Sequence, residues 1–259
     1  MTVPGDADYG TMDFCAMKYE AKDVAGVPTS QASGAPWAFI NQTDAIAACS
    51  GLGSGYQLLS NEEWMTITAN AANIPSNWSG GNVGSGLIFI GHSDDDPISA
   101  CEADPDDTKG YVEVDCIGKD ATGDNDIAQR RTHSLSNGQI IWDLSGNLRE
   151  WTSFTESADK PSPQVTTYTE YTQPVIGSSS LPLNRLIPTQ EVKAFWNDSW
   201  NSSQGIGMVR IGAAGTGGGL TRGGGFMGTT RNGIFRFRID QAPDTASSTL
   251  GFRCTYKAP

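Results

Sequence analysis

The spacing of apolar residues after about Asn73 constrains the fold of this chain most strongly. Apolar residues there occur in short runs separated by Gly, Asn, Asp and Ser, and no stretch keeps the spacing of an amphipathic helix. Short apolar runs bounded by turn-forming residues are typical of strands. We therefore predict β-structure and loops for most of the chain, with strands near 87–90, 140–142, 208–211, 234–239 and 250–254.

Two helices are predicted before that point. In the first, Thr43 is the expected N-cap, and the helix is expected to turn Ile46, Ala47 and Cys49 toward the core. The second helix has the stronger start signal, because Ser60 and Glu63 form the S-x-x-E pattern of a capping box. The chain should therefore combine a small helical part with a larger part made of strands and loops.

Composition agrees with a loop-rich domain. The 259 residues include 31 Gly and 13 Pro, and only 18% are charged, which disfavours a helical bundle. Hydrophobic residues make up 37%, with seven Trp, so the chain can fill a core. The length suits one large domain or two small ones, and no second shift in composition marks a boundary.

Charge is distributed unevenly along the chain. The net charge of -12 disfavours a general nucleic-acid binder, because binding phosphates needs a basic face. From residue 210 onward, however, seven basic residues accompany two acidic ones, so this part carries +5. Two interpretations stay open: an acidic or phosphorylated partner for the C-terminal segment, or arginines that donate hydrogen bonds to carbonyls within a loop-rich fold.

The range 94–126 is strongly acidic, with twelve carboxylates against two lysines. It contains no D-x-D-x-D-G calcium-loop pattern. A solvated insertion loop is the favoured interpretation, and a cation-associated loop is the alternative.

No window of about 18 apolar residues is present, so no membrane insertion is expected, and residues 1–10 lack the pattern of a signal peptide. Five cysteines cannot all pair within the chain, and no C-x-x-C occurs. Cys101 and Cys116 could form a disulfide across the acidic range, which would favour an extracellular setting or a virion. Buried free thiols are the alternative.

Four strings of residues, in order, resemble one known family. They are DFCAMKYEAK (13–22), GYQLLSNEEWMTIT (55–68), IIWDLSGNLREWT (140–152) and the closing RGGGF...LGFRC (222–226 and 250–254). Each is similar to a segment of the C-type lectin fold of the formylglycine-generating-enzyme type. One motif alone would be weak, but four in the same order along nearly the whole chain are specific.

This resemblance implies a fold of the α+β class, a single C-type lectin-like domain over 1–259. The domain would have two helices, a small twisted antiparallel sheet and long ordered loops, with 94–126 as an acidic insertion. Four aromatic residues are then expected to anchor the core and its loops: Trp64, Trp142, Trp151 and Phe252.

The resemblance argues against the enzymatic activity of that family. The enzyme places two copper-binding cysteines after its R-G-G-S motif, and these positions correspond to Gly228 and Gly233 here. Glycine has no side chain to bind copper or carry a thiol. The two histidines, His92 and His133, lie in different predicted loops and suggest no catalytic set. We therefore expect that the protein is not an enzyme.

The family also binds calcium around the turn that corresponds to D-L-S-G-N-L-R-E-W. The resemblance implies carboxylate ligands from Asp143 and Glu150 and backbone carbonyls from Gly146 and Leu148. Oxygen ligands of this kind suit a hard cation. The alternative is that both carboxylates cap backbone amides of the loop, so a structural calcium ion is implied but no cofactor is required.

The segment from Arg222 to Cys254 has a narrower resemblance. It is similar to the variable region of proteins diversified by diversity-generating retroelements, in which changeable codons alternate with a fixed frame, and the variable region would span about 210–254. The framework positions would be Arg222, Gly223, Gly224, Gly233, Phe235, Ala242, Pro243, Gly251, Phe252 and Arg253. The variable positions would be Gly225, Phe226, Met227, Gly228, Arg231, Arg238, Asp240, Gln241, Asp244, Thr245, Ser247, Ser248 and Thr249.

The resemblance implies a ligand-binding protein with a changeable recognition surface. Phe226, Arg231, Phe237 and Arg238 would be its affinity anchors. The expected partner is a protein on a host or target surface, with no nucleic acid, and the expected location is extracellular, on a cell or on a virion. Two alternatives stay open: a fixed-sequence adhesive or structural surface protein, or a degenerate relative of the enzyme with altered chemistry.

Overall fold

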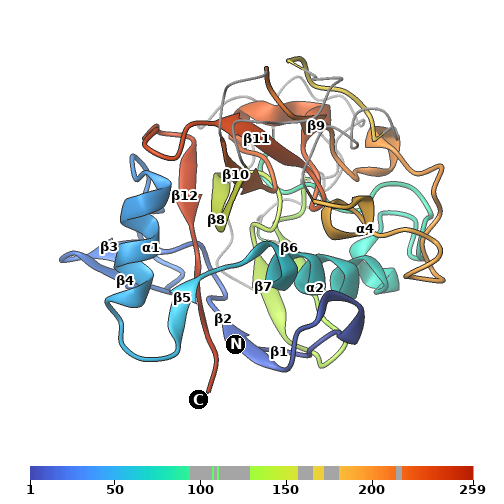
Figure 1. Cartoon of the computed structure of the whole chain (residues 1–259). Helices are drawn as coiled ribbons and strands as arrows, with labels where there is room; N and C mark the ends of the chain where they lie inside the picture. Colours follow the sequence, from blue (N-terminus) through green and yellow to red (C-terminus); the bar gives the residue numbers. More distant parts are fainter. Residues whose placement is uncertain are drawn as a thin grey trace.

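Short strands, two principal helices and long connecting loops make up the computed structural model, which describes residues 1–93, 107, 110, 129–156, 166–171, 181–213 and 218–258 (Figure 1). This is the α+β fold that the sequence motifs imply. Almost all of the acidic range 94–126 lies outside the described residues. No helix in the described part is long and apolar enough to span a membrane.

The larger sheet has five strands in the order β12-β8-β10-β11-β9. Its central pairs, β8 (Arg149–Glu156) with β10 (Gly218–Arg222) and β10 with β11 (Phe237–Gln241), are antiparallel. Both edge pairs are parallel, because β12 (Leu250–Phe252) runs along β8 and β9 (Val209–Arg210) runs along β11. The prediction of an antiparallel sheet is therefore confirmed for the central strand pairs, whereas both edge pairs are parallel.

The second sheet joins the two ends of the chain. Its order is β1-β2-β13-β5, all antiparallel, formed by Thr2–Val3, Phe14–Ala16, Cys254–Tyr256 and Tyr56–Leu58. Both termini consequently lie at the lower edge of the molecule in Figure 1, away from β9 and β11.

Two short hairpins complete the strands. The first pairs β3 (Lys22–Val24) with β4 (Val27–Thr29), and the second pairs β6 (Thr132–Ser134) with β7 (Ile140–Trp142).

Helix α2 (Asn61–Ala72) begins as predicted. The Ser60 hydroxyl accepts from the Glu63 N–H at 3.1 Å, and the Glu63 carboxylate accepts from the Ser60 N–H at 2.7 Å, which completes the capping box. Helix α4 (Leu183–Leu186) is a single turn, and the described 3-10 helices are η1 (Ala7–Tyr9), η2 (Pro75–Asn77), η4 (Ser202–Gln204) and η5 (Phe226–Arg231).

Helix α1 (Gln42–Ser50) differs from the prediction in its N-cap and in the face that it buries. Asn41, not Thr43, is the N-cap, and its side chain accepts from the Asp44 N–H at 2.8 Å. With the helix starting earlier, Ile46 and Ala47 are exposed, contrary to the prediction, and the buried residues are Gln42, Ala45 and Cys49. An Asn two positions before Thr is the better cap here because its side chain reaches the free N–H groups of the first turn.

The core consists of two clusters of buried side chains. The larger one packs α2 and the β6–β7 hairpin against the strands around β10 and β11, and the smaller one packs α1 against β5, β8 and β12. Trp64 and Trp151 are fully buried, as is Phe252, and Trp142 is nearly so. The prediction that these aromatic residues anchor the fold is confirmed.

A disulfide between Cys49 and Cys254 ties α1 to β13, with a Cα–Cα distance of 5.4 Å. Cys15 is a free, exposed thiol. The pairing suggested for Cys101 with Cys116 lies outside the described residues. The sequence separation of 205 between Cys49 and Cys254 leaves no local pattern from which this pairing could have been predicted.

The disulfide gives a first prediction. We expect the double substitution Cys49→Ala with Cys254→Ala to lower the free energy of unfolding by about 2–5 kcal/mol, because the cross-link closes a very long loop in the unfolded chain. Urea denaturation followed by tryptophan fluorescence measures this loss. Cys15→Ala is the matched control and should leave the midpoint unchanged; equal midpoints for both variants would contradict the prediction.

Candidate functional site

The segment from Arg222 to Cys254 passes three times through the five-stranded sheet. It leaves β10, forms η5, returns along β11 and closes through β12. Its loops therefore lie at the end of the sheet that is remote from the chain termini (Figure 1). Gly223 and Gly224 have φ of 78° and 88°, a conformation that suits glycine and turns the chain sharply out of β10.

Buried polar contacts hold this segment in place. Arg222 is fully buried, donates to the Leu186 carbonyl at 2.9 Å and stacks on Phe237 at 5.2 Å. Asn232 donates to both Ser93 Oγ and the Gly225 carbonyl at 2.7 Å. Because buried polar groups are costly unless they are paired, these contacts fix the course of the loop.

Burial separates the predicted framework positions from the predicted variable ones. Eight of the ten framework positions are buried, with Ala242 exposed and Pro243 half-buried. Eleven of the thirteen variable positions reach the surface. The exposed ones are Met227, Arg231, Asp244 and Ser248; the half-buried ones are Phe226, Arg238, Asp240, Gln241, Thr245, Ser247 and Thr249; the buried ones are Gly225 and Gly228.

Gly228 does not have the space that a variable position needs. A Cβ added there would lie 1.7 Å from Asn232 Oδ1, whereas a Cβ at Gly225 would meet its nearest atom at 3.4 Å. Gly225 is thus compatible with a side chain and Gly228 is not. Phe237, expected as an affinity anchor, is fully buried under Arg222 and belongs to the core.

A small pocket of about 170 Å³ opens among the variable positions. It lies between η5 and β11, and the start of β8 and Tyr168 complete it. Six variable positions contribute to its lining, together with three residues that the sequence interpretation did not select. The lining residues are Arg149, Tyr168, Gly225, Met227, Gly228, Arg231, Arg236, Arg238 and Thr249.

Guanidinium groups surround the Tyr168 ring. Arg231, Arg236 and Arg238 lie 5.3, 4.7 and 5.8 Å from its centroid, and Arg236 also donates to its hydroxyl at 2.5 Å. Burial alone would raise the pKa of Tyr168, but Arg236, Arg238 and Arg149 together hold that pKa below its ordinary value. The pocket is therefore a region of strongly positive potential within an acidic protein.

Only part of this charge is neutralised. Asp240 accepts from Arg238 at 2.8 and 3.0 Å and lies 2.7 Å from Arg210. Arg149 instead donates to neutral partners, Gln241 at 3.2 Å and Thr249 at 2.7 Å. Burial, followed by repulsion from the neighbouring arginines, lowers the pKa of Arg149 to about 10.

Sequence signals for this pocket were incomplete. Arg231 and Arg238 were selected from the retroelement resemblance. Arg149 belongs to the L-R-E-W string, which predicts a turn and no binding role for this arginine. The only sequence signal at Arg236 is its position in the basic segment. Tyr168 lies far from both strings, and nothing in its local sequence marks it.

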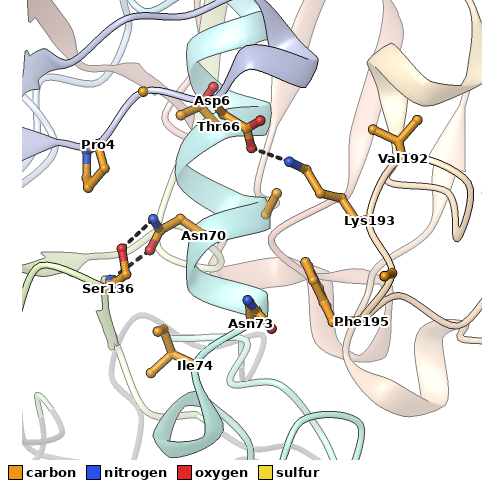
Figure 2. A pocket seen from close by; sticks show the side chains of 13 residues that line it. Pro4, Asp6, Thr66, Asn70, Asn73, Ile74, Ser136, Val192, Lys193 and Phe195 are labelled. Atoms are coloured by element: carbon orange, nitrogen blue, oxygen red, sulfur yellow. Dashed lines mark hydrogen bonds and ion pairs between the residues drawn. The ribbon is translucent and has the colours of Figure 1, made fainter.

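A larger hollow of about 410 Å³ lies between the N-terminal segment, α2 and the segment around Lys193 (Figure 2). Lys193 donates to Asp6 at 2.5 Å and to Asp8 at 2.7 Å, so its charge is neutralised within the fold. Asn70 and Ser136 hydrogen-bond to each other across one side of this hollow. Its polar groups therefore satisfy one another, in contrast to the arginines around Tyr168.

The four positions expected to hold calcium do not fit a calcium ion in this structure. Both Asp143 oxygens accept from Arg131, at 2.7 and 2.8 Å. Both Glu150 oxygens accept from the fully buried Arg253. In the described part of the chain, no group of three His, Cys, Asp or Glu side chains is placed to hold a metal. Arginines thus provide the positive charge that a cation would bring.

The two positions that correspond to the copper-binding cysteines do not fit such a pair either. A Cβ at Gly233 would lie 2.2 Å from the Ile206 carbonyl carbon, and a Cβ at Gly228 would lie 1.7 Å from Asn232 Oδ1. The histidines do not converge: His133 lies in strand β6, not in a loop, and contacts the Phe89 carbonyl at 2.8 Å, while His92 stacks on Phe226.

Comparison with solved structures finds distant similarity. The Major Tropism Determinant P3c variant shares 9% identity over 95% of this chain at a TM-score of 0.37, and PvdO from Pseudomonas aeruginosa shares 12% over 95% at 0.38. Variable protein 1 of Treponema denticola shares 12% over all of this chain at 0.36. The chain spans 46% of the P3c variant, 81% of PvdO and 99% of the Treponema protein.

Sequence comparison gives a more specific result. A family model described as the Sulfatase-modifying factor enzyme 1-like domain matches residues 8–258, almost the entire chain. Comparison with curated proteins found no significant match.

The contrast between two glycines gives a second prediction. We expect Gly228→Ala to lower the free energy of unfolding by about 1–3 kcal/mol, because the new methyl group collides with the Asn232 side chain. Gly225→Ala, three residues earlier in the same loop, is the control and should stay within about 0.5 kcal/mol of the unchanged protein. Urea denaturation of both variants measures the difference, and equal losses would refute the assignment of Gly228 to the frame.

The arginine partners of Asp143 and Glu150 give a third prediction. We expect the Tm in excess EGTA to equal the Tm in calcium chloride, because neither carboxylate is free to bind the ion. An ion present at a hundred times its Kd would add about 2.7 kcal/mol, or several degrees in Tm, so differential scanning calorimetry would detect it. If calcium does raise the Tm, replacing Asp94, Asp95 and Asp96 by Asn tests whether the ion binds the acidic range instead.

Proposed function

Because the chain belongs to the family of sulfatase-modifying factor enzyme 1-like domains but holds glycines where the enzyme's copper-binding cysteines would be, we propose that it uses this fold to present a changeable ligand-binding surface. The surface consists of the variable positions between Arg222 and Cys254. The ligand is a protein on a host or target surface. Binding, not oxidation, is the activity of this segment.

One observation carries the proposal: the predicted variable positions face outward, and the predicted framework positions are almost all buried. A binding surface can change its partner without loss of stability only if its changeable residues stay outside the core. Both groups lie on a single segment, and within 241–249, where variable and framework positions follow one another closely, no residue is fully buried. An ordinary fixed loop has no need of this separation.

The site chemistry also supports binding. Met227 is exposed, and Phe226 is half-buried against His92, so apolar contact area is available beside the arginine pocket. Aromatic and arginine side chains in such settings contribute most of the affinity at protein interfaces. With Phe237 buried, the affinity anchors are reduced to Phe226, Arg231 and Arg238.

We place the protein outside the cytoplasm, on a cell surface or a virion. The Cys49–Cys254 disulfide supports this location, because disulfides persist in oxidising compartments and are rare in the cytosol. A protein whose ligand sits on another cell or particle must also be exposed to it.

Sequencing around the gene tests the proposal. We expect a reverse-transcriptase gene nearby and a near-copy of codons 210–254 that carries adenines where the variable positions are encoded. Sequencing the same locus in many sister isolates should find substitutions at the surface positions such as Met227, Asp244 and Ser248, with Gly233 and Phe235 unchanged. A locus with neither a reverse transcriptase nor a template copy would contradict the proposal and favour a fixed adhesive protein.

A further inference from the structure

The pocket around Tyr168 has a ligand chemistry of its own. We infer that it binds one carboxylate, the side chain of an Asp or Glu on the protein ligand, between Arg149, Arg231 and Arg236. This inference rests on the proposed function for the identity of the partner as a protein. It adds the point at which that partner is held.

Unpaired positive charge is the first argument. Arg149, Arg231 and Arg236 form no ion pair with any carboxylate in the described part of the chain. Arg236 is almost completely buried, and its Nε–H has no hydrogen-bond partner. A buried cation without a counter-charge is unfavourable, so a site that sets the buried Arg236 beside the half-buried Arg149 and the exposed Arg231 is suited to receive an anion.

Size is the second argument. The volume of about 170 Å³ is well below the roughly 300–1,000 Å³ of pockets that enclose drug-sized ligands. It is suited to a single side chain. Guanidinium groups present paired N–H donors in a plane, a geometry that matches the two oxygens of a carboxylate.

The charge of the whole protein is the third argument. A net charge of -12 repels an extended polyanion such as a nucleic acid, while a pocket with local positive potential can still attract one acidic side chain. The acidic Asp240 remains bound to Arg238 and Arg210 at the rim, so it does not fill the pocket. A carboxylate that enters from outside is the counter-charge that the pocket lacks.

The four arginines differ in whether they can change. Arg231 and Arg238 occupy variable positions, whereas Arg149 lies on β8 outside the variable region and Arg236 is not among the variable positions. The floor of the pocket would therefore keep its charge in every variant of the surface. An acidic side chain would serve as a constant anchor, and the changeable rim would decide which acidic partner is accepted.

Titration with N-acetylglutamate, followed by NMR of the arginine Nε–H groups, tests the inference on the full chain. We expect binding with a Kd in the millimolar range and a shift of the Arg236 Nε–H signal. N-acetylglutamine, the neutral analogue of the same shape, should bind at least about 10-fold more weakly, because charge-assisted hydrogen bonds are lost. Sodium sulfate and inorganic phosphate are titrated in parallel.

Arg231→Gln is the diagnostic variant, because this side chain is exposed and its loss does not threaten folding. It should weaken N-acetylglutamate binding by about 5-fold to 10-fold. Lys257→Gln removes the same charge at the chain terminus, away from the pocket, and should leave the Kd unchanged. Equal Kd values for the glutamate and glutamine probes, or no effect of Arg231→Gln, would overturn the inference.

The remaining outcomes separate the two proposals. If sulfate or phosphate binds and N-acetylglutamate does not, the inference that the pocket binds a carboxylate is wrong. The pocket would then be assigned to a sulfated or phosphorylated group. An intact template copy in the genome with no anion binding would refute the pocket and leave the proposed function standing. Carboxylate binding without any template copy would leave the pocket standing and refute diversification.

Discussion

The ion pair between Glu150 and Arg253 holds together the strands on which the segment from Arg222 to Cys254 depends. Both side chains are fully buried, and Arg253 also donates to the carbonyls of Met17 and Trp142. Glu150 lies on β8, whose two neighbours in the sheet are β10 and β12. Those neighbours carry the beginning and the end of the segment from Arg222 to Cys254. Removing one partner of such a buried pair would leave an uncompensated charge, at a cost of about 3–5 kcal/mol.

This arrangement explains how a segment with so many polar residues can be rigid. Its two ends are fixed on either side of β8, Arg222 opposite Glu150 in one ladder and Gly251 opposite Glu150 in the other. Between them, Asn232 ties the loop to Ser93 and Gly225. The surface residues contribute little to these contacts, so the stability of the segment depends on its frame, and the proposed function assigns recognition to the residues above it. In the turn for which the resemblance implies calcium, Arg131 and Arg253 form ion pairs with Asp143 and Glu150.

The sequence predicted the features that depend on local chemistry. The capping box of α2 was correct because Ser60 and Glu63 make their contacts within one turn. The cap of α1 was wrong by two residues, because Asn41 and Thr43 are both good caps and sequence alone does not rank them. Long-range contacts gave no local signal, and the disulfide between Cys49 and Cys254 is the clearest example.

The candidate site also combines features that a local sequence pattern indicates with features that depend on long-range contacts. Most positions that the retroelement resemblance gives as variable reach the surface, whereas the pocket also needs Arg149 from β8 and Tyr168 from a separate loop. Glycine at a variable position and glycine required by a close approach look identical in a sequence, and only the position of Asn232 shows that Gly228 has no room for a side chain. An arginine in a basic segment is equally ambiguous. Arg222 and Arg253 are buried and donate to carbonyls within the fold, whereas Arg231 and Arg236 line the pocket. The interpretation that arginines of the basic segment donate to carbonyls within the fold is therefore correct for Arg222 and Arg253, whereas an acidic partner for Arg231 and Arg236 is our proposal.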